Sequence, residues 1–359
     1  MDVLWLSTRK CEDLSSSSQQ GIITALDGAG VEVTFVGPTS NGNQQFSNCK
    51  HIQLTQQQIW GRRTSSFAKK VKLWLHHHIA NFQVILVEWP LVHYLQSILR
   101  QTRQPIILID RSPPADQTIL AKFQWRHWKE AWMEVEKGNF VAGTVVSHVH
   151  RQFIWSKFVS EPKCIEIKAG VQQISSTPVE YTKPIKMVYH GRLDKHRGIS
   201  YLIELSKQAD LLNILHTLTF YGDGNALTII ERCESDSVIY GGKLGHEEMI
   251  DTLKQHHVGL LPMPPNEVWV TASPLKQSEY LAAGLPILGI SHPGHFLEST
   301  EEFIHLFDEH KFISEGLNFL KNLSKNNFTK MSIKAQDYAS ERCTWAYCCS
   351  EFIKFLQSL

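Results

Sequence analysis

The chain has 359 residues, which is long enough for two medium-sized domains with separate hydrophobic cores. Its 36 basic and 35 acidic side chains leave a formal net charge of +1, so no overall field marks it as a nucleic-acid binder. Hydrophobic residues make up 42% and charged residues 20%, a composition that excludes an intrinsically disordered chain.

In the first half of the chain, short β-branched runs alternate with amphipathic segments. Such runs are typical of buried parallel strands joined by crossover helices. The predicted strands are residues 3–6, 31–36, 84–87, 105–109 and 144–146. This alternation predicts an α/β domain over residues 1–172.

Two helical segments of this half carry aromatic or basic stripes. Residues 62–79, RRTSSFAKKVKLWLHHHI, place Phe67, Val71 and Leu75 on one face with basic side chains around it. That face can pack on the sheet while the lysines are solvated, or it can lie on anionic lipid. Trp125, Trp128 and Trp132 share a second helical face, for which core packing is favoured over a sugar platform.

A polar stretch with two prolines, VQQISSTPVEYTKP at 171–184, indicates a linker, and a second alternating series follows it. Its predicted strands are residues 187–190, 217–221, 238–240, 258–261, 286–290 and 303–306. They predict a second doubly wound domain over residues 185–343, with a helix at 344–359 that returns to the first domain. Because open α/β sheets bind ligands at the carboxyl ends of their strands, we expect the site between the two domains.

The loop HGRLDKHRG at 190–198 lies where a predicted strand gives way to a helix. It gathers Gly191, Arg192, Lys195 and Arg197, and such cations beside a close-approaching backbone suit a phosphate group. A solvated surface loop is the alternative interpretation. YGDG at 221–224 marks a similar strand end, where a tight turn by itself accounts for the glycines.

The segment ASPLKQSEYLAAGLPIL at 272–288 carries the most information. Ser273 is a suitable helix N-cap and Pro274 a suitable first helical residue, so a helix N-terminus is expected at the strand ends. Its free amides at Leu275 and Lys276 could hold a diphosphate. Glu279, about one and a half turns into the helix, could accept two ribose hydroxyls.

Taken together, GRLDKHRG, YGDG, VIYGGKLGHEEM, VGLLP and SPLKQSEYLAAGLPIL follow one another in an order and at spacings that span residues 185–359. In this respect the chain resembles the family 4 type retaining glycosyltransferases of the GT-B fold. The resemblance implies two Rossmann-like domains facing across a cleft. It also implies transfer of a hexose, with retention of configuration, from a UDP- or GDP-linked donor to a glycan or lipid-linked acceptor.

Several roles follow from the resemblance alone. Arg192 and Arg197 match the family's two cations on the donor diphosphate, Glu279 matches the glutamate that binds the ribose, and residues 238–242 match the nucleobase site. The expected catalytic residues are thus Arg192, Arg197 and Glu279. The expected donor-binding residues are Gly191, Lys195, Gly222, Asp223, Tyr240, Gly241, Thr271, Ser273, Pro274, Leu275 and Lys276.

One departure from the family bears directly on the donor sugar. Family members commonly have a second glutamate eight residues before the ribose-binding one, and Thr271 occupies that place here. A GT-B nucleotide-sugar epimerase or an inactive nucleotide-sugar binder is therefore the alternative function. A dinucleotide-dependent oxidoreductase is disfavoured, because no GxGxxG motif follows a predicted strand.

In this family the N-terminal domain binds the acceptor. The best candidate segment there is ILIDRSPPADQ at 107–117, which follows a buried strand and brings Asp110 and Arg111 to the cleft edge. We expect Asp110 to take part in catalysis and Arg111 to bind the acceptor. A structural ion pair is the other interpretation of these two residues.

Cysteine and histidine usage bears on location and cofactors. The seven cysteines form no CxxC pair, and the beginning MDVLWLSTRK lacks the apolar core of a signal peptide. We therefore expect a cytoplasmic protein. If residues 62–79 contact lipid, the protein would lie at the inner membrane face. HHH at 76–78 has no acidic or cysteine partner at ligand spacing. We expect no metal or other cofactor in the transfer and no nucleic-acid partner.

Overall fold

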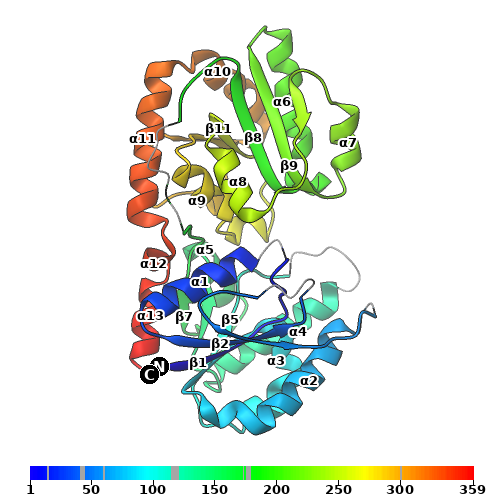
Figure 1. Ribbon diagram of the computed structural model, residues 1–359, viewed down its shortest axis with the longest axis vertical. Coiled ribbons are helices and arrows are strands. Elements are labelled where there is room, and N and C mark those ends of the chain that lie inside the picture. The colour runs from blue at the N-terminus through cyan, green and yellow to red at the C-terminus, as the bar shows by residue number, and fades with distance from the viewer. Residues whose placement is uncertain are drawn as a thin grey trace. The chain divides into compact units, whose positions relative to one another are not determined.

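The computed structural model describes residues 1–13, 16–40, 45–59, 61–114, 121–172, 174, 179–299 and 301–359. Its contacts divide the chain into two compact units (Figure 1). Unit 1 consists of Met1–Lys168 and Trp345–Leu359, and unit 2 of Ala169–Thr344.

The boundary between the units differs slightly from the one expected. The sequence analysis placed residues 169–172 with the first domain, whereas the structure places them in unit 2. The reason is a backbone pairing: the Val171 N–H donates to the Cys343 carbonyl at 2.7 Å, and Val171 forms an isolated parallel bridge with Thr344.

Unit 1 is built on a seven-stranded parallel sheet in the order β3-β2-β1-β4-β5-β6-β7. Its strands are β1 Asp2–Leu6, β2 Glu32–Pro38, β3 Lys50–Leu54, β4 Val84–Glu88, β5 Ile106–Ile109, β6 Ala142–Val145 and β7 Cys164–Glu166. The central strands are buried along their length, as expected for a parallel sheet with helices on both faces. All five predicted strands are present.

The two edge strands, β3 and β7, were not predicted. The β3 sequence KHIQL is half-buried and mostly polar, and β7 has only three residues. An edge strand is covered less than a central one, so neither segment needs the continuous apolar run by which the central strands were recognised.

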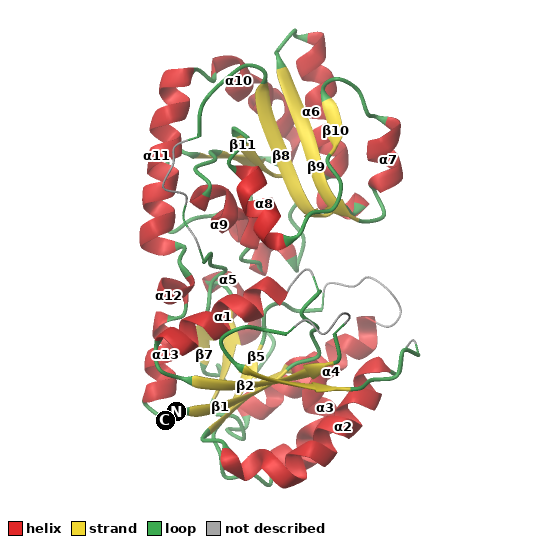
Figure 2. Ribbon diagram, viewed as in Figure 1, coloured by secondary structure: helices red, strands yellow, loops and turns green. Residues whose placement is uncertain are grey.

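Helices cover the sheet of unit 1 (Figure 2). They are α1 Ser16–Gly28, α2 Arg63–His78, α3 Trp89–Leu99, α4 Ala121–Glu136, α5 His148–Trp155, α12 Trp345–Cys348 and α13 Ser350–Gln357, with a 3₁₀ turn at Ile79–Asn81. In α2, Phe67, Val71 and Leu75 are buried in the core of the unit, so its apolar face packs inward. Trp128 and Trp132 of α4 are also core residues.

The end of the chain, α12 and α13, belongs to unit 1. The Trp345 indole packs against α1 at Gly21, where a Cβ atom would overlap the ring, so glycine is required there. The Lys163 ammonium lies 4.3 Å from the centroid of the Phe355 ring in α13.

Unit 2 is built on a six-stranded parallel sheet in the order β10-β9-β8-β11-β12-β13. All six predicted strands are present, as β8 Ile185–Arg192, β9 His216–Asp223, β10 Val238–Tyr240, β11 Val258–Leu261, β12 Ile287–Ile290 and β13 Ile304–Phe307. Its helices are α6 Ile199–Leu211, α7 Leu227–Arg232, α8 His246–Leu253, α9 Leu275–Ala282, α10 Phe312–Asn322 and α11 Lys325–Arg342. Four 3₁₀ turns are η3 Lys195–Arg197, η4 Trp269–Thr271, η5 Pro293–His295 and η6 Glu309–Lys311.

The strand order positions the functional residues of unit 2. The chain moves outward from β8 to β9 and β10, then crosses back to β11 on the other side of β8. The direction of winding therefore reverses between β8 and β11. In open parallel sheets the crevice at the carboxyl ends of such strands is the usual ligand site.

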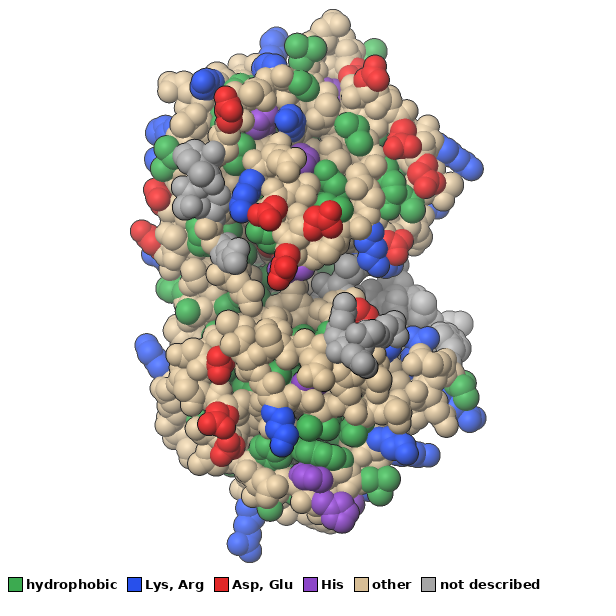
Figure 3. Space-filling model, viewed as in Figure 1, with side chains coloured by type: hydrophobic (Ala, Val, Ile, Leu, Met, Phe, Trp, Pro, Cys, Tyr) green, Lys and Arg blue, Asp and Glu red, His purple; other side chains and the backbone are tan. Residues whose placement is uncertain are grey.

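No helix in the described part of the chain is long and apolar enough to cross a membrane. On the face drawn in Figure 3, lysine and arginine side chains are scattered among aspartates and glutamates. This mixture agrees with the nearly neutral composition.

Candidate functional site

The carboxyl ends of β8 and β9 bring the two glycine-containing motifs together. Gly191 pairs with Gly222 and Arg192 with Asp223 in the parallel register. Both glycines have positive φ, 108° at Gly191 and 135° at Gly222, and a Cβ at Gly222 would overlap the Gly191 carbonyl. Glycine is thus required in both motifs, and the tight-turn interpretation of YGDG accounts for Gly222.

Asp194 holds the two arginines of the loop. Arg192 Nη2 lies 3.2 Å from Asp194 Oδ1, and Arg197 Nε lies 3.6 Å from Asp194 Oδ2. Burial by itself would raise the pKa of the Asp194 carboxyl, but the hydrogen bond from Arg192 and the charges of both arginines lower it below its ordinary value. Sequence reasoning named both cations and missed the carboxylate that orients them.

Arg197 lies deeper in the site than Arg192. Its side chain is 21% exposed, against 47% for Arg192, and its guanidinium lies 4.7 Å from the centroid of the Trp269 ring. The Nε atom of Arg197, at ion-pair distance from Asp194, and the Nε1 atom of Trp269 are buried, and neither makes a hydrogen bond to any of the described residues. Buried polar atoms of this kind are usually satisfied, so the two donors suit a polar ligand.

Lys195 is exposed, and its N–H donates to Asn225 Oδ1 at 2.8 Å. Its backbone therefore stabilises the loop.

The N-terminus of α9 differs in detail from the prediction. The helix begins at Leu275 with Pro274 in the N-cap position, and no side chain caps it. Ser273 does not cap the helix, because its hydroxyl accepts a hydrogen bond from the Ala169 N–H at 3.0 Å. Thr271, in place of the family's first glutamate, is buried in η4 and donates to the Val268 carbonyl at 2.8 Å.

Lys276 brings a third cation to the site. A Cβ on Gly191 would lie 3.2 Å from Lys276 Nζ, and this ammonium lies 5.4 Å from the centroid of the Tyr189 ring. Burial, with a smaller effect of the Arg197 charge, lowers the pKa of Lys276 to about 8. Sequence reasoning had assigned only the backbone amide of this residue.

Glu279 is buried, at 4% exposure, between two histidines. Its Oε2 lies 3.2 Å from His190 Nε2 and its Oε1 lies 3.5 Å from His246 Nδ1. Burial tends to raise the pKa of Glu279, but its contact with His190 and the charges of His190, His246 and Lys276 bring the pKa below its ordinary value. The carboxylate is therefore ionised at neutral pH.

Both histidines were missed by sequence reasoning. His190 directly precedes the GRLDKHRG motif, and His246 is the first residue of α8. Each histidine adjoins or lies within a motif of the expected donor site, and this position is the sequence signal that could have identified it.

Tyr240 and Gly241 lie at the end of β10, beside these loops. The Tyr240 hydroxyl donates to the Gly222 carbonyl at 3.0 Å, which connects the expected nucleobase segment to the YGDG turn. A Cβ on Gly241 would overlap the ring of Tyr221. The structure thus brings together the donor-site candidates of unit 2 on the β8, β9, β10 and α9 ends.

Asp110 of unit 1 lies in the protein core. It is fully buried, and its Oδ2 accepts hydrogen bonds from Trp128 Nε1 at 2.6 Å and Trp132 Nε1 at 2.8 Å. Its Oδ1 accepts from the Ser112 N–H at 3.0 Å. With both oxygens engaged by the protein, this geometry favours a structural role over the expected catalytic one.

Arg111 is half-buried and also engaged with the protein. Its Nη1 donates to the Ile167 carbonyl at 2.5 Å, and burial lowers the pKa of the guanidinium. Residues 115–117 of the same expected acceptor segment lie outside the described residues.

Comparisons of the chain with known proteins give matches among solved structures alone. No protein-family model matches the chain, and no curated protein matches it in sequence. Among solved structures, sucrose-phosphate synthase from Thermosynechococcus elongatus is similar, with a TM-score of 0.76 at 14% identity over 99% of this chain and 98% of that one.

Two further structures are similar. A TarM mutant from S. aureus in complex with UDP has a TM-score of 0.73 at 10% identity, over 98% of this chain and 99% of that one. Anabaena HepE in complex with UDP has a TM-score of 0.70 at 13% identity, over 100% of both chains. These are GT-B structures, so the chain has the GT-B fold and the predicted fold is confirmed.

Proposed function

We propose that the chain is a retaining glycosyltransferase of the family 4 type that moves a hexose from a nucleoside-diphosphate sugar to a glycan or lipid-linked acceptor. The observation that carries this proposal is the gathering of Arg192, Arg197, Lys276 and Glu279 at the strand ends of unit 2. Three cations suit a diphosphate, and an ionised buried carboxylate suits a diol. In this proposal unit 2 binds the donor and unit 1 the acceptor.

The proposed reaction breaks the bond between the sugar's anomeric carbon and the diphosphate oxygen, which keeps the electron pair. The acceptor oxygen bonds to that carbon on the same face, and its proton passes to the leaving diphosphate. Arg192, Arg197 and Lys276 stabilise the charge that develops on the leaving group, and the amides of Leu275 and Lys276 add to it. These side chains supply the neutralising charge in a reaction that uses no metal ion.

Two of the similar GT-B structures, the TarM mutant and HepE, are complexes with UDP, and this supports the proposal. We therefore expect UDP to stabilise the chain more than GDP or ADP does, because a ligand that binds the folded state raises the melting temperature. A thermal-shift series with these nucleotides, their sugars and NAD(P) tests this expectation. A shift with NAD(P) alone would overturn the proposal.

An activity assay distinguishes the proposed glycosyltransferase from a protein that only binds the nucleotide sugar. The threonine at position 271 favours an inactive nucleotide-sugar binder as the second candidate, since it removes a carboxylate expected to contact the sugar. Such a protein would show the UDP shift without hydrolysis or transfer of any UDP-sugar. NMR analysis of the product's anomeric configuration tests retention.

The pKa of Lys276 predicts a pH dependence. As the pH rises through about 8, the free protein loses this charge, so kcat/KM for the donor should fall. Stability should change in the opposite direction. The unfolded chain binds the Lys276 proton more tightly than the folded chain, so the contribution of this group to the free energy of unfolding rises between pH 8 and 10.5.

The pH profiles of wild type and two variants test this prediction. Lys276→Arg should extend the alkaline limb of kcat/KM to higher pH, and Lys276→Met should remove the limb and lower the activity. A limb that is identical in all three proteins would contradict the assignment.

Peripheral contact of residues 62–79 with an inner membrane face stays a prediction. Phe67, Val71 and Leu75 of α2 are buried, whereas Leu73 of the same helix is 63% exposed. With the apolar face packed inward, Leu73 and the basic side chains are what α2 can offer to lipid, so we expect little co-sedimentation with anionic liposomes at low salt. Binding that Lys69→Glu and Lys70→Glu abolish would establish the contact.

A further inference from the structure

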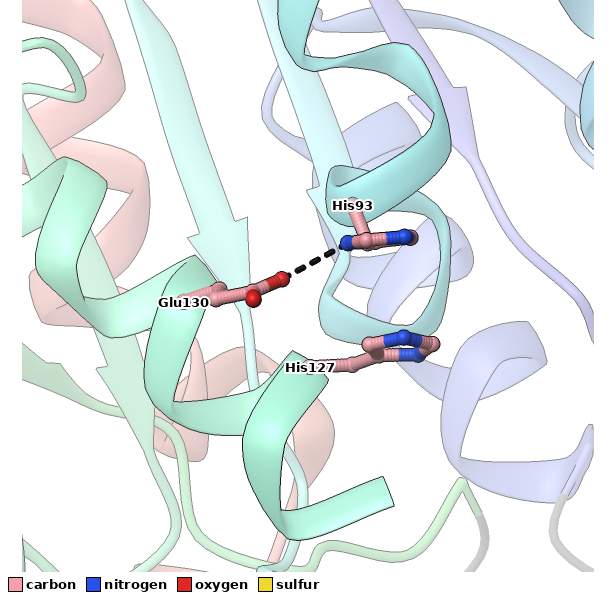
Figure 4. A group of neighbouring side chains, drawn as sticks. All are labelled: His93, His127 and Glu130. Carbon is pink, nitrogen blue, oxygen red and sulfur yellow. Dashed lines mark hydrogen bonds and ion pairs between the residues drawn. The ribbon is translucent and has the colours of Figure 1, made fainter. Parts of the chain in front are cut away.

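Unit 1 carries a group of side chains that the proposed transfer does not use. His93 of α3 and His127 and Glu130 of α4 lie beside one another, with Glu130 pointing toward His93 (Figure 4). His93 Nδ1 lies 2.7 Å from Glu130 Oε2, and the two imidazole rings are stacked with centroids 4.1 Å apart. One ligand atom from each of the three residues lies within 4.8 Å of the others.

The backbone beneath this group is fixed by other contacts. On the next turns of the same two helices, Gln96 Nε2 and Arg100 Nε donate to the buried Glu134 carboxylate at 2.8 and 2.9 Å. Leu95 and Trp128 pack in the core below. The backbone positions of the three residues are therefore set by helix packing, and their side chains can rotate without disturbing it.

We propose that His93, His127 and Glu130 form a binding site for a divalent transition-metal ion of the Zn²⁺ type. Two imidazoles and one carboxylate are ligands that Zn²⁺ prefers, and water would complete the coordination. On α4 the two ligands are three residues apart, which puts them on the same face of the helix, and the third comes from the neighbouring helix.

The distances need only side-chain adjustment. Ligand atoms around a tetrahedral zinc ion are about 3.3 Å apart, given bonds of about 2.0 Å. The present spread of up to 4.8 Å closes by rotation of partly exposed side chains. His93 Nδ1 would exchange its Glu130 hydrogen bond for the metal.

Two further contacts suit a metal ligand set. Arg126 Nε donates to Glu130 Oε1 at 2.9 Å, which orients the carboxylate and leaves Oε2 for the ion. The ring nitrogens of His127 have no hydrogen-bond partner among the described residues, so a lone pair is available there.

Isothermal titration of the untagged, EDTA-treated chain with ZnCl₂ tests the site. We expect one Zn²⁺ per chain, no comparable binding of Mg²⁺, and an affinity at least about 10-fold lower in His127→Ala and Glu130→Gln. With Co²⁺ as the probe, wild type should show the visible absorption of a four-coordinate site, and Glu130→Gln should lose it. Circular dichroism checks that each variant is folded.

The matched control is His76→Ala with His77→Ala, which removes two exposed histidines of α2 outside the group. Its zinc affinity and stoichiometry should equal those of wild type. Failure of the folded wild type to bind Zn²⁺ would overturn the proposal. Binding that the α2 variant abolishes, or that His127→Ala and Glu130→Gln leave unchanged, would overturn it as well.

Discussion

Replacing Arg197 by alanine is expected to lower kcat/KM for sugar transfer by about 10²- to 10³-fold, the usual effect of removing one group that stabilises a leaving charge. The Arg197 side chain is less exposed than that of Arg192, and its guanidinium lies over the Trp269 ring. Little water therefore screens its charge. Arg192→Ala should also depress turnover strongly. The effect should be smaller, because the Arg192 side chain is 47% exposed.

Steady-state kinetics with the donor identified by thermal shift would measure both effects. Arg197→Lys should restore part of the activity, since it keeps the charge and loses the paired donors. Lys207→Ala, an exposed lysine on α6, is the matched control and should retain wild-type turnover. Wild-type turnover in both arginine variants would remove the donor-site assignment.

A second large effect is expected in unit 1. Asp110→Asn should lower the free energy of unfolding by about 3 kcal/mol, because an amide has one acceptor oxygen where the carboxylate has two. If that oxygen accepts from Trp128 and Trp132, the NH2 group faces the Ser112 N–H, and buried donors are left without a partner. For a unit of this size such a loss corresponds to a fall in melting temperature of about 10 °C. Thermal unfolding followed by circular dichroism measures it.

Kinetics distinguish this structural role from the catalytic one expected from the sequence. The folded Asp110→Asn protein should keep most of its transfer activity below its melting temperature. A double-mutant cycle with Trp132→Phe should show strong coupling, since the two residues share one hydrogen bond. Loss of turnover with an unchanged melting temperature would instead assign Asp110 to the chemistry.

The residues of the donor site were foreseen where the signal is local. Gly191, Arg192, Arg197 and Glu279 lie in short motifs, and a strand end followed by glycines and cations is visible in a few consecutive letters. The half-polar strand β3 was missed because it carries no such local signal: its place in the sheet comes from its pairing with β2.

What pairs with those residues was not foreseen. Glu279 contacts His190 and His246, and Lys276 reaches Gly191, across segments separated by tens of residues. Ser273 is a residue type that often caps helices, yet its hydroxyl accepts a hydrogen bond from the Ala169 N–H. A side chain's partner depends on which distant segment the fold places beside it, and local propensity carries no information on that.

The sequence by itself determined the alternation of strands and helices, the two parallel sheets and the glycine- and arginine-rich strand ends of unit 2. Hydrophobic period and turn chemistry act over a few residues, so they can be read without the fold. Only the tertiary structure decided that Asp110 accepts hydrogen bonds from two tryptophans, that Lys276 is a half-buried cation beside Gly191 and that His93 lies beside His127 and Glu130. Burial and proximity arise from the order of strands and the packing of helices, which bring together residues far apart in the chain.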